Sequence, residues 1–178
     1  MGFRYIRLEE FPPNISADDF EAIAVYSNMK RTGHFKCSNE KVNKLYSNII
    51  WSQKDNFLDV PTDCPQRDER LGWTADAQVF AKAAMYNFDV RKFFSKWLND
   101  LSADQYPNGI VPYIVPDVLD GSEEATSAAY GDAAVIIPWE MYRIYGDKKI
   151  LERQIDSMIA WVEYMHGYGE EEYLWLGH

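Results

Sequence analysis

The chain has 178 residues, of which 47% are apolar and 15% aromatic, and this composition is typical of a folded protein rather than a disordered one. Its formal net charge of −10 comes from 28 acidic and 18 basic residues. This charge disfavours nucleic acid and membrane surfaces as partners, because both select basic patches. No apolar run is long enough to cross a membrane, and the opening residues contain no signal-peptide core. We therefore expect a cytoplasmic protein with neither partner.

The cysteines and histidines give no sign of a metal centre. Cys37 and Cys64 are too few for a disulfide scaffold. The three histidines lie far apart in the sequence, and no CxxC or HExxH spacing occurs. No histidine lies near Cys64, so a buried structural thiol is favoured over a nucleophile there. We expect no metal and no cofactor.

The first thirty residues differ from the rest in their pattern. Residues 3–10 alternate in part between apolar and polar side chains, and residues 20–27 are rich in β-branched and aromatic ones. A Pro-Pro-Asn turn separates the two segments, so the pattern predicts two strands. Two strands alone do not make a stable unit. Residues 1–30 are therefore interpreted as the end of a preceding β domain with a linker.

From Ser38 onward, apolar residues recur with the 3.6-residue period of helices that bury one face. Ser38 and Asp89 are plausible N-caps, and Gly146 is a stop signal. Five helices are predicted, beginning near Ser38, Thr74, Asp89, Asp132 and Asp147. Their expected inward residues are Val42, Leu45, Tyr46, Ile49 and Ile50; Val79, Phe80, Ala83 and Ala84; Val90, Phe93, Phe94, Trp97, Leu98 and Leu101; Val135, Ile136, Trp139 and Tyr142; and Ile150, Leu151, Ile155, Met158, Val162 and Met165.

Several of these helices are apolar over more than one stripe, so they need neighbours on two sides, as in a ring of paired helices. The sequence therefore predicts a mainly α fold built of helical hairpins. Because five helices do not close such a ring, we expect residues 31–178 to be part of a larger domain. Trp97, Trp139 and Trp161 are expected in its core.

A long connection, residues 103–131, separates the third and fourth predicted helices. Pro107, Pro112 and Pro116 argue against a regular helix through its first half. Its apolar and aromatic residues are too many for a disordered linker, and long loops in compact domains are commonly functional. We expect an ordered loop that covers one end of the helices.

The segment 61–78 reads PTDCPQRDERLGWTADAQ and lies between the first two predicted helices. It concentrates carboxylates, arginines and an indole, namely Asp63, Asp68, Glu69, Asp76, Arg67, Arg70 and Trp73. A carboxyl that donates a proton needs burial or a neighbouring carboxylate, and a close arginine opposes this. Carboxylates beside a flat aromatic face are the composition expected of a carbohydrate site, where glycosidases place two carboxyls across one bond.

Simpler interpretations stay open from spacing alone. Clusters of Asp, Arg and Glu are commonly ion-paired structural loops, and Trp73 could belong to the core. The Tyr-Gly-Asp sequence at 130–132 could form only a helix cap. A site for magnesium and diphosphate would need carboxylates three or four residues apart on one helix face, which the segment does not provide.

These residues resemble the signature of bacterial α-L-rhamnosidases, glycoside hydrolase family 78. The likeness runs through DVPTDCPQRDERLGWTADAQVFAKAA, KWLNDLSADQYPNGIVPYIVPDV, YGDAAVIIPWEMYRIYGD and ILERQIDSMIAWVEYM, and upstream through GFRYIRLEEF and RTGHFKCSNEKVNKLYSNIIWSQKDNFLDV. The resemblance implies part of an (α/α)6 barrel in residues 31–178, with 1–30 as the end of a β-sandwich domain. It also implies inverting hydrolysis of terminal non-reducing α-L-rhamnose residues from a rhamnose-containing glycoside or oligosaccharide.

The same resemblance implies roles for individual residues. Glu69 is similar in position to the family's general acid. Positions that line the rhamnose pocket correspond to Asp63, Arg67, Trp73, Asp76 and Tyr130. Tyr130 stands where the family commonly has Trp, which implies a smaller stacking platform, and Ala75 stands where Gly is usual.

The family's general base is a glutamate far downstream, and nothing in these 178 residues matches it. Inverting hydrolysis needs a base ~6.5–9.5 Å from the acid, with a water between them. We therefore expect these residues to be inactive alone and prone to self-association. The rival hypothesis is a non-catalytic carbohydrate-binding or scaffold protein that keeps the pocket without the base.

Overall fold

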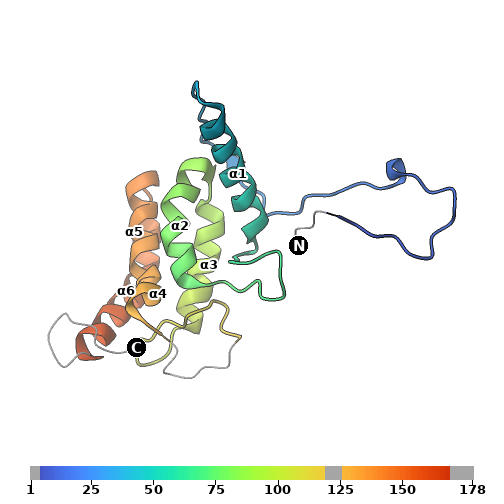
Figure 1. Ribbon diagram of the computed structural model, residues 1–178. Coiled ribbons are helices and arrows are strands. Elements are labelled where there is room, and N and C mark those ends of the chain that lie inside the picture. The colour runs from blue at the N-terminus through green and yellow to red at the C-terminus, as the bar shows by residue number, and fades with distance from the viewer. Residues whose placement is uncertain (1–4, 119–125, 169–178) are drawn as a thin grey trace.

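The computed structural model describes residues 5–118 and 126–168 and is mainly α, as the sequence predicts (Figure 1). The helices are α1 (Glu40–Asn56), α2 (Thr74–Asn87), α3 (Arg91–Asp104), α4 (Ala128–Gly131), α5 (Ala133–Tyr145) and α6 (Lys148–Tyr168), with a 3-10 turn at Ala17–Asp19. Two short antiparallel pairs join β1 (Lys30–Arg31) to β4 (Phe88–Asp89) and β2 (Phe57–Leu58) to β3 (Val60–Pro61). Across the described ranges, no helix has both the length and the apolarity of a membrane span.

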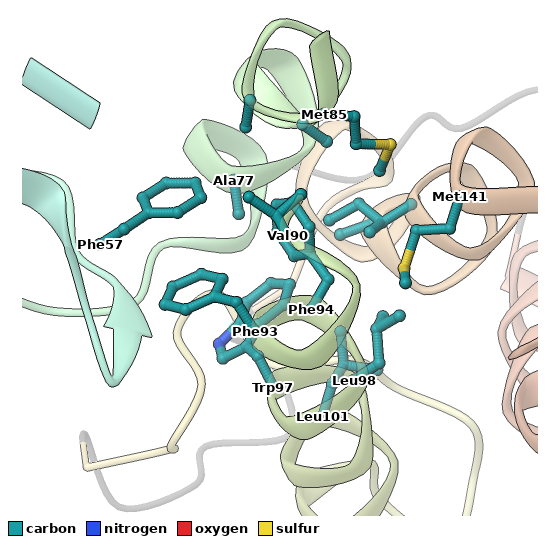
Figure 2. Packing of buried hydrophobic residues seen from close by; sticks show 14 of the residues in the cluster. Phe57, Ala77, Met85, Val90, Phe93, Phe94, Trp97, Leu98, Leu101 and Met141 are labelled. Atoms are coloured by element: carbon teal, nitrogen blue, oxygen red, sulfur yellow. The ribbon is translucent and has the colours of Figure 1, made fainter. Parts of the chain in front are cut away.

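The core lies where α5 packs against α2, α3 and α6, and α3 contributes more of its large side chains than any other helix does (Figure 2). Phe57, from β2, stacks on Phe93 with ring centroids 4.4 Å apart. All of the residues predicted to face inward from this helix are buried, namely Val90, Phe93, Phe94, Trp97, Leu98 and Leu101. The predicted face of the third helix is therefore confirmed.

The helix ends follow local capping chemistry. Asn39, and not the predicted Ser38, caps α1, because its side-chain oxygen accepts hydrogen bonds from the backbone of Lys41 and Val42. Asp89 accepts a bond from the backbone of Arg91 at 3.2 Å, although the formal cap is the next residue. Gly146 ends α5 with a φ of 68°, the left-handed conformation that glycine adopts most easily.

Four predicted inward faces are partly wrong, including that of α6, where Ile155 and Val162 are exposed. On α2, Val79 is 82% exposed, and the buried residues are instead Ala77, Ala81, Ala84 and Met85. On α5, Ile136 and Trp139 face outward, while Ala133, Ala134, Ile137 and Met141 are buried. On α1, Val42 and Leu45 are exposed. The cause is shared: an apolar stripe shows that a helix is amphipathic, but the packing of its neighbours decides which stripe is covered.

The strands predicted at 3–10 and 20–27 do not form in the described residues. This segment extends away from the helices (Figure 1). A strand needs ladder partners, and the described part of the chain offers none to these residues. The segment joins the helices only near its end, where the backbone of Ser27 donates to Phe57 at 2.9 Å and β1 pairs with β4. Residues 3 and 4 lie outside the described residues.

The long connection is ordered over its described first half, as predicted. Ile110, Val111, Ile114 and Val115 are buried, and Trp97 donates from its indole to the carbonyl of Val115 at 3.0 Å. The loop thus covers one end of the helices and reaches back to segment 61–78. Its residues 119–125 lie outside the described residues.

Candidate active site

Segment 61–78 is held in place by residues that lie far along the chain. The backbone of Val115 donates to Gly72, and that of Thr74 donates to Tyr113, both at 2.9 Å. We call this pairing of 113–115 with 72–74 the cross-loop pairing. A Cβ at Gly72 would lie 2.2 Å from the carbonyl oxygen of Val115, so glycine is required by the close approach of the two backbones.

Glu69 has defined partners on both carboxylate oxygens. Its Oε2 accepts from Arg67, at 2.8 Å from Nε and 2.7 Å from Nη2. Its Oε1 accepts from the indole Nε1 of Trp73 at 3.0 Å. The Glu69 side chain is 28% exposed, so a substrate atom could reach it.

Asp68 and Glu69 are adjacent in sequence but have different surroundings. Asp68 is 99% exposed and pairs with Arg70 at 3.3 Å. Each of the two carboxylates therefore pairs with its own arginine. Exposed pairs of the Asp68 kind contribute little to stability.

Asp63 lies beside Glu69 and carries an acceptor that has no partner. Its Oδ1 is buried and accepts no hydrogen bond within the described residues. Burial raises the pKa of Asp63, but hydrogen bonds with Cys64 and Glu69 outweigh it, so the pKa lies below its usual value. The hydrogen bond to Asp63 is also the main reason that the pKa of the Cys64 thiol is raised. Cys64 is half-buried, and its raised pKa disfavours the thiolate that a nucleophile needs.

Asp76 lies in the first turn of α2. Partial burial raises its pKa, and the charges of Asp63 and Glu69 raise it further. Asp63 and Asp76 both line a small cavity of about 160 Å³ between α1 and α2. The charges of Asp63 and Glu69 therefore act on Asp76.

Three aromatic rings lie beside the carboxyls. Trp73 and Tyr130 have ring centroids 5.8 Å apart, and Tyr113 meets Tyr130 edge-on at 4.6 Å. Trp73 is half-buried and lies outside the buried core cluster, so its assignment to the core is wrong. Tyr113 was missed from the sequence, although the aromatic and apolar composition of residues 103–131 was a signal for it.

The structure brings the six predicted site residues into one connected group. Glu69 contacts Arg67 and Trp73, Trp73 lies against Tyr130, and Asp63 interacts with Glu69 and Asp76. Carboxylates and aromatic rings thus lie together in this group. Such a group can bind sugar hydroxyls through its carboxylates and can present one carboxyl to a glycosidic oxygen.

One group in the described ranges has a spacing that could hold a metal ion. Single ligand atoms of Asp63, Cys64 and Glu69 lie within 4.8 Å of one another. Both oxygens of Glu69 already accept hydrogen bonds from Arg67 and Trp73, so an ion would have to displace these donors. The arrangement suits hydrogen bonding better than metal ligation.

Comparison with known proteins places this chain in a family. Residues 30–178 match the model of the bacterial alpha-L-rhamnosidase 6 hairpin glycosidase domain. An alpha-L-rhamnosidase of Formosa agariphila is 47% identical over 163 residues, which is 90% of this chain and 17% of that protein. One of Alteromonas sp. is 44% identical over 165 residues, 92% of this chain and 18% of that protein.

Solved structures of alpha-L-rhamnosidases also resemble this chain. The alpha-L-rhamnosidase of Dictyoglumus thermophilum superposes with a TM-score of 0.86 at 38% identity, over 90% of this chain and 18% of that one. That of Streptomyces avermitilis, complexed with L-rhamnose, superposes at 0.77 with 40% identity, over 82% of this chain and 14% of that one. The chain thus spans less than a fifth of these relatives, and its helical hairpins are part of an (α/α)6 barrel. The chain belongs to the bacterial α-L-rhamnosidase family of six-hairpin glycosidases.

Proposed function

We propose that the full-length protein containing this chain hydrolyses terminal α-L-rhamnosides with inversion, and that Glu69 protonates the leaving oxygen. The observation that carries the proposal is the carboxyl of Glu69, fixed by Arg67 and Trp73 beside the carboxyl of Asp63. The names of the relatives and the rhamnose complex of one of them support the substrate class.

Glu69 has neighbours of both charges. The guanidinium of Arg67 bonds its Oε2, and the carboxylate of Asp63 lies beside it. In this proposal, a bound sugar draws Arg67 toward its hydroxyls and frees Oε2 for the glycosidic oxygen.

Asp63 holds the sugar and does not act as the base. Single oxygens of Asp63 and Glu69 lie within 4.8 Å of each other, whereas an inverting pair lies about 6.5–9.5 Å apart to admit a water. The unpartnered Oδ1 of Asp63 suits a sugar hydroxyl, because a buried acceptor without a donor costs free energy. The base of the proposed reaction lies outside the described residues.

The test uses the full-length protein and an aryl α-L-rhamnoside. Proton NMR of the first product should show β-L-rhamnose, which later mutarotates. A first product in the α form would contradict inversion.

Glu69→Gln and Asp68→Asn are a matched pair, since both remove a charge from an arginine-paired carboxylate. On a natural rhamnoside, Glu69→Gln should lose about 10²–10⁴-fold in kcat, the usual contribution of general acid–base catalysis. Asp68→Asn should lose little, because its side chain lies in solvent. Similar losses in both variants would contradict the role of Glu69.

A protein that binds rhamnosides without cleaving them is the second candidate. The two bonds from Arg67 to Oε2 favour it, because they occupy the oxygen that hydrolysis would need free. Calorimetric binding of an aryl rhamnoside by the full-length protein with no turnover would favour this candidate over hydrolysis.

A further inference from the structure

Trp73 contributes more to the site than the flat face of its ring. Its Nε1 donates to Oε1 of Glu69 at 3.0 Å. The polar edge of the indole is thereby occupied by a carboxylate of the same loop, four residues earlier in the sequence. Stacking on a sugar needs the ring face and makes no use of this N–H, so the hydrogen bond is a separate property of the residue.

The indole is held more firmly than the arginine on the other oxygen. Trp73 is half-buried, its backbone forms a β-bridge with Ile114 in the cross-loop pairing, and its ring meets Tyr113 and Tyr130 at 6.3 and 5.8 Å. The Arg67 side chain is 58% exposed. A long exposed side chain loses more conformational entropy when fixed than a ring that is already packed.

We propose that Trp73 is the positioning residue of Glu69: its indole N–H fixes Oε1 so that the carboxyl can present its other oxygen to the glycosidic oxygen. This rests on the proposed function, in which Glu69 is the acid. The indole is connected to the helix core by hydrogen bonds. Trp97 donates to the carbonyl of Val115, and the backbone of Val115 donates to Gly72, the residue before Trp73. The orientation of the Glu69 carboxyl therefore depends on the packed core, through Trp73, rather than on the exposed ion pair with Arg67.

The proposed step leaves the indole proton in place. Glu69 gives its proton to the leaving oxygen as the C–O bond breaks, with the bonding electron pair going to that oxygen. The anomeric carbon takes a hydroxyl from water, whose remaining proton goes to the base. Glu69 ends the step as a carboxylate, and the bond from Trp73 strengthens as that charge develops.

The test separates positioning of the acid from stacking on the sugar. In the full-length protein, Trp73→Phe keeps an aromatic face and removes the N–H. Replacing Trp73 by 3-benzothienylalanine keeps the bicyclic ring and removes only the donor. Two substrates are compared: methyl α-L-rhamnoside, whose leaving group needs protonation, and 2,4-dinitrophenyl α-L-rhamnoside, whose leaving group needs little. L-Rhamnose affinity is measured on the same samples by calorimetry.

Both variants should lose about 10- to 100-fold in kcat on the methyl glycoside, which is the scale of a lost preorganised donor. The loss on the dinitrophenyl glycoside should be much smaller, and the benzothienyl protein should bind L-rhamnose as the wild type does. Equal losses on both substrates, or weaker rhamnose binding as the main effect, would overturn the proposal and leave Trp73 as a stacking platform.

Glu69→Gln in the same assay keeps the two ideas distinguishable. If Glu69→Gln shows the leaving-group dependence and the Trp73 variants do not, the positioning role alone is wrong. If Glu69→Gln itself shows no such dependence, the acid assignment of the proposed function fails.

Discussion

Helices α3 and α6 have equally regular apolar patterns, yet their predicted inward residues differ in burial. Every predicted inward residue of α3 is buried. On α6 the predicted Ile150 and Trp161 are buried, but the predicted Ile155 and Val162 are exposed, and Gln154 and Ser157 are buried instead. α3 packs against α5 and α6 and receives Phe57 and the long loop, while α6 has neighbours only on one side in the described residues. The sequence predicts which face of a helix is buried when the helix has one apolar stripe, but not when it has two.

The largest expected effect comes from truncating the α3 face and comparing it with the outer face of α6. Phe94 is fully buried among Phe57, Phe93 and Trp97. Phe94→Ala should therefore lower the free energy of unfolding of the 178-residue chain by about 3–5 kcal/mol. Ile159→Ala on α6 is the control, since Ile159 is 47% exposed, and should cost much less. Urea unfolding measures both, and similar losses would contradict the comparison.

Gly72→Ala should have the next largest effect on the free energy of unfolding, because it disrupts the cross-loop pairing that connects α3 to the site. The new Cβ would lie 2.2 Å from the carbonyl oxygen of Val115, so the two backbones must separate. We expect a loss of about 1–3 kcal/mol, typical of forced overpacking, together with lower activity of the full-length protein. Gly167→Ala is the control, since nothing lies within 4 Å of its Cβ position. Unchanged stability in Gly72→Ala would mean that the pairing is not tight.

The contact between Asp132 and the buried side of α6 can be tested by the pH dependence of the free energy of unfolding. Its carboxylate accepts from the indole of Trp161 at 3.0 Å, and burial raises its pKa, with that hydrogen bond lowering it in part. A carboxyl whose pKa is higher in the folded state makes stability fall as pH rises from the unfolded to the folded pKa. Asp132→Asn keeps an acceptor and removes the titration.

The free energy of unfolding of Asp132→Asn, relative to the wild type, should therefore increase from about pH 4 to pH 7. Urea unfolding at several pH values measures this difference. A difference that stays constant with pH, or that moves in the opposite direction, would contradict the burial of Asp132.

The smallest effect on stability is expected on the outer face of α6, where association should change instead. Ile155, Ile159 and Val162 form an exposed apolar stripe, and contiguous patches of this kind drive association. Ile159→Lys should change the free energy of unfolding of the 178-residue chain by roughly 0.5 kcal/mol or less. The same variant should elute later than the parent chain on a sizing column. A parent chain that elutes as a monomer would refute the association.

Local chemistry was predictable from the sequence where it depends on near neighbours. The face of α3, the glycine stop at Gly146 and the order of the loop over residues 103–118 follow from periodicity and turn residues. The site residues came from the motif and its resemblance, and the structure confirms that they lie together. Their roles remain proposals.

Long-range geometry was not predictable in the same way. The cross-loop pairing joins residues about forty positions apart, and no pattern in either segment specifies the other. The outward direction of Trp139 depends on which stripe of α5 meets α2 and α3. The predicted strands depended on partners that the described residues do not contain, so no strand forms in residues 5–10 and 20–27.

The most direct test of the central claim, that Glu69 is the acid, is the leaving-group dependence of kcat/KM. A series of aryl α-L-rhamnosides with phenols of increasing pKa is hydrolysed by the full-length protein and by its Glu69→Gln variant. The account predicts a shallow dependence in the wild type and a steep fall with phenol pKa in the variant, because only the variant must expel the phenolate without a proton. Parallel dependences in the two proteins would contradict the claim and place the acid elsewhere.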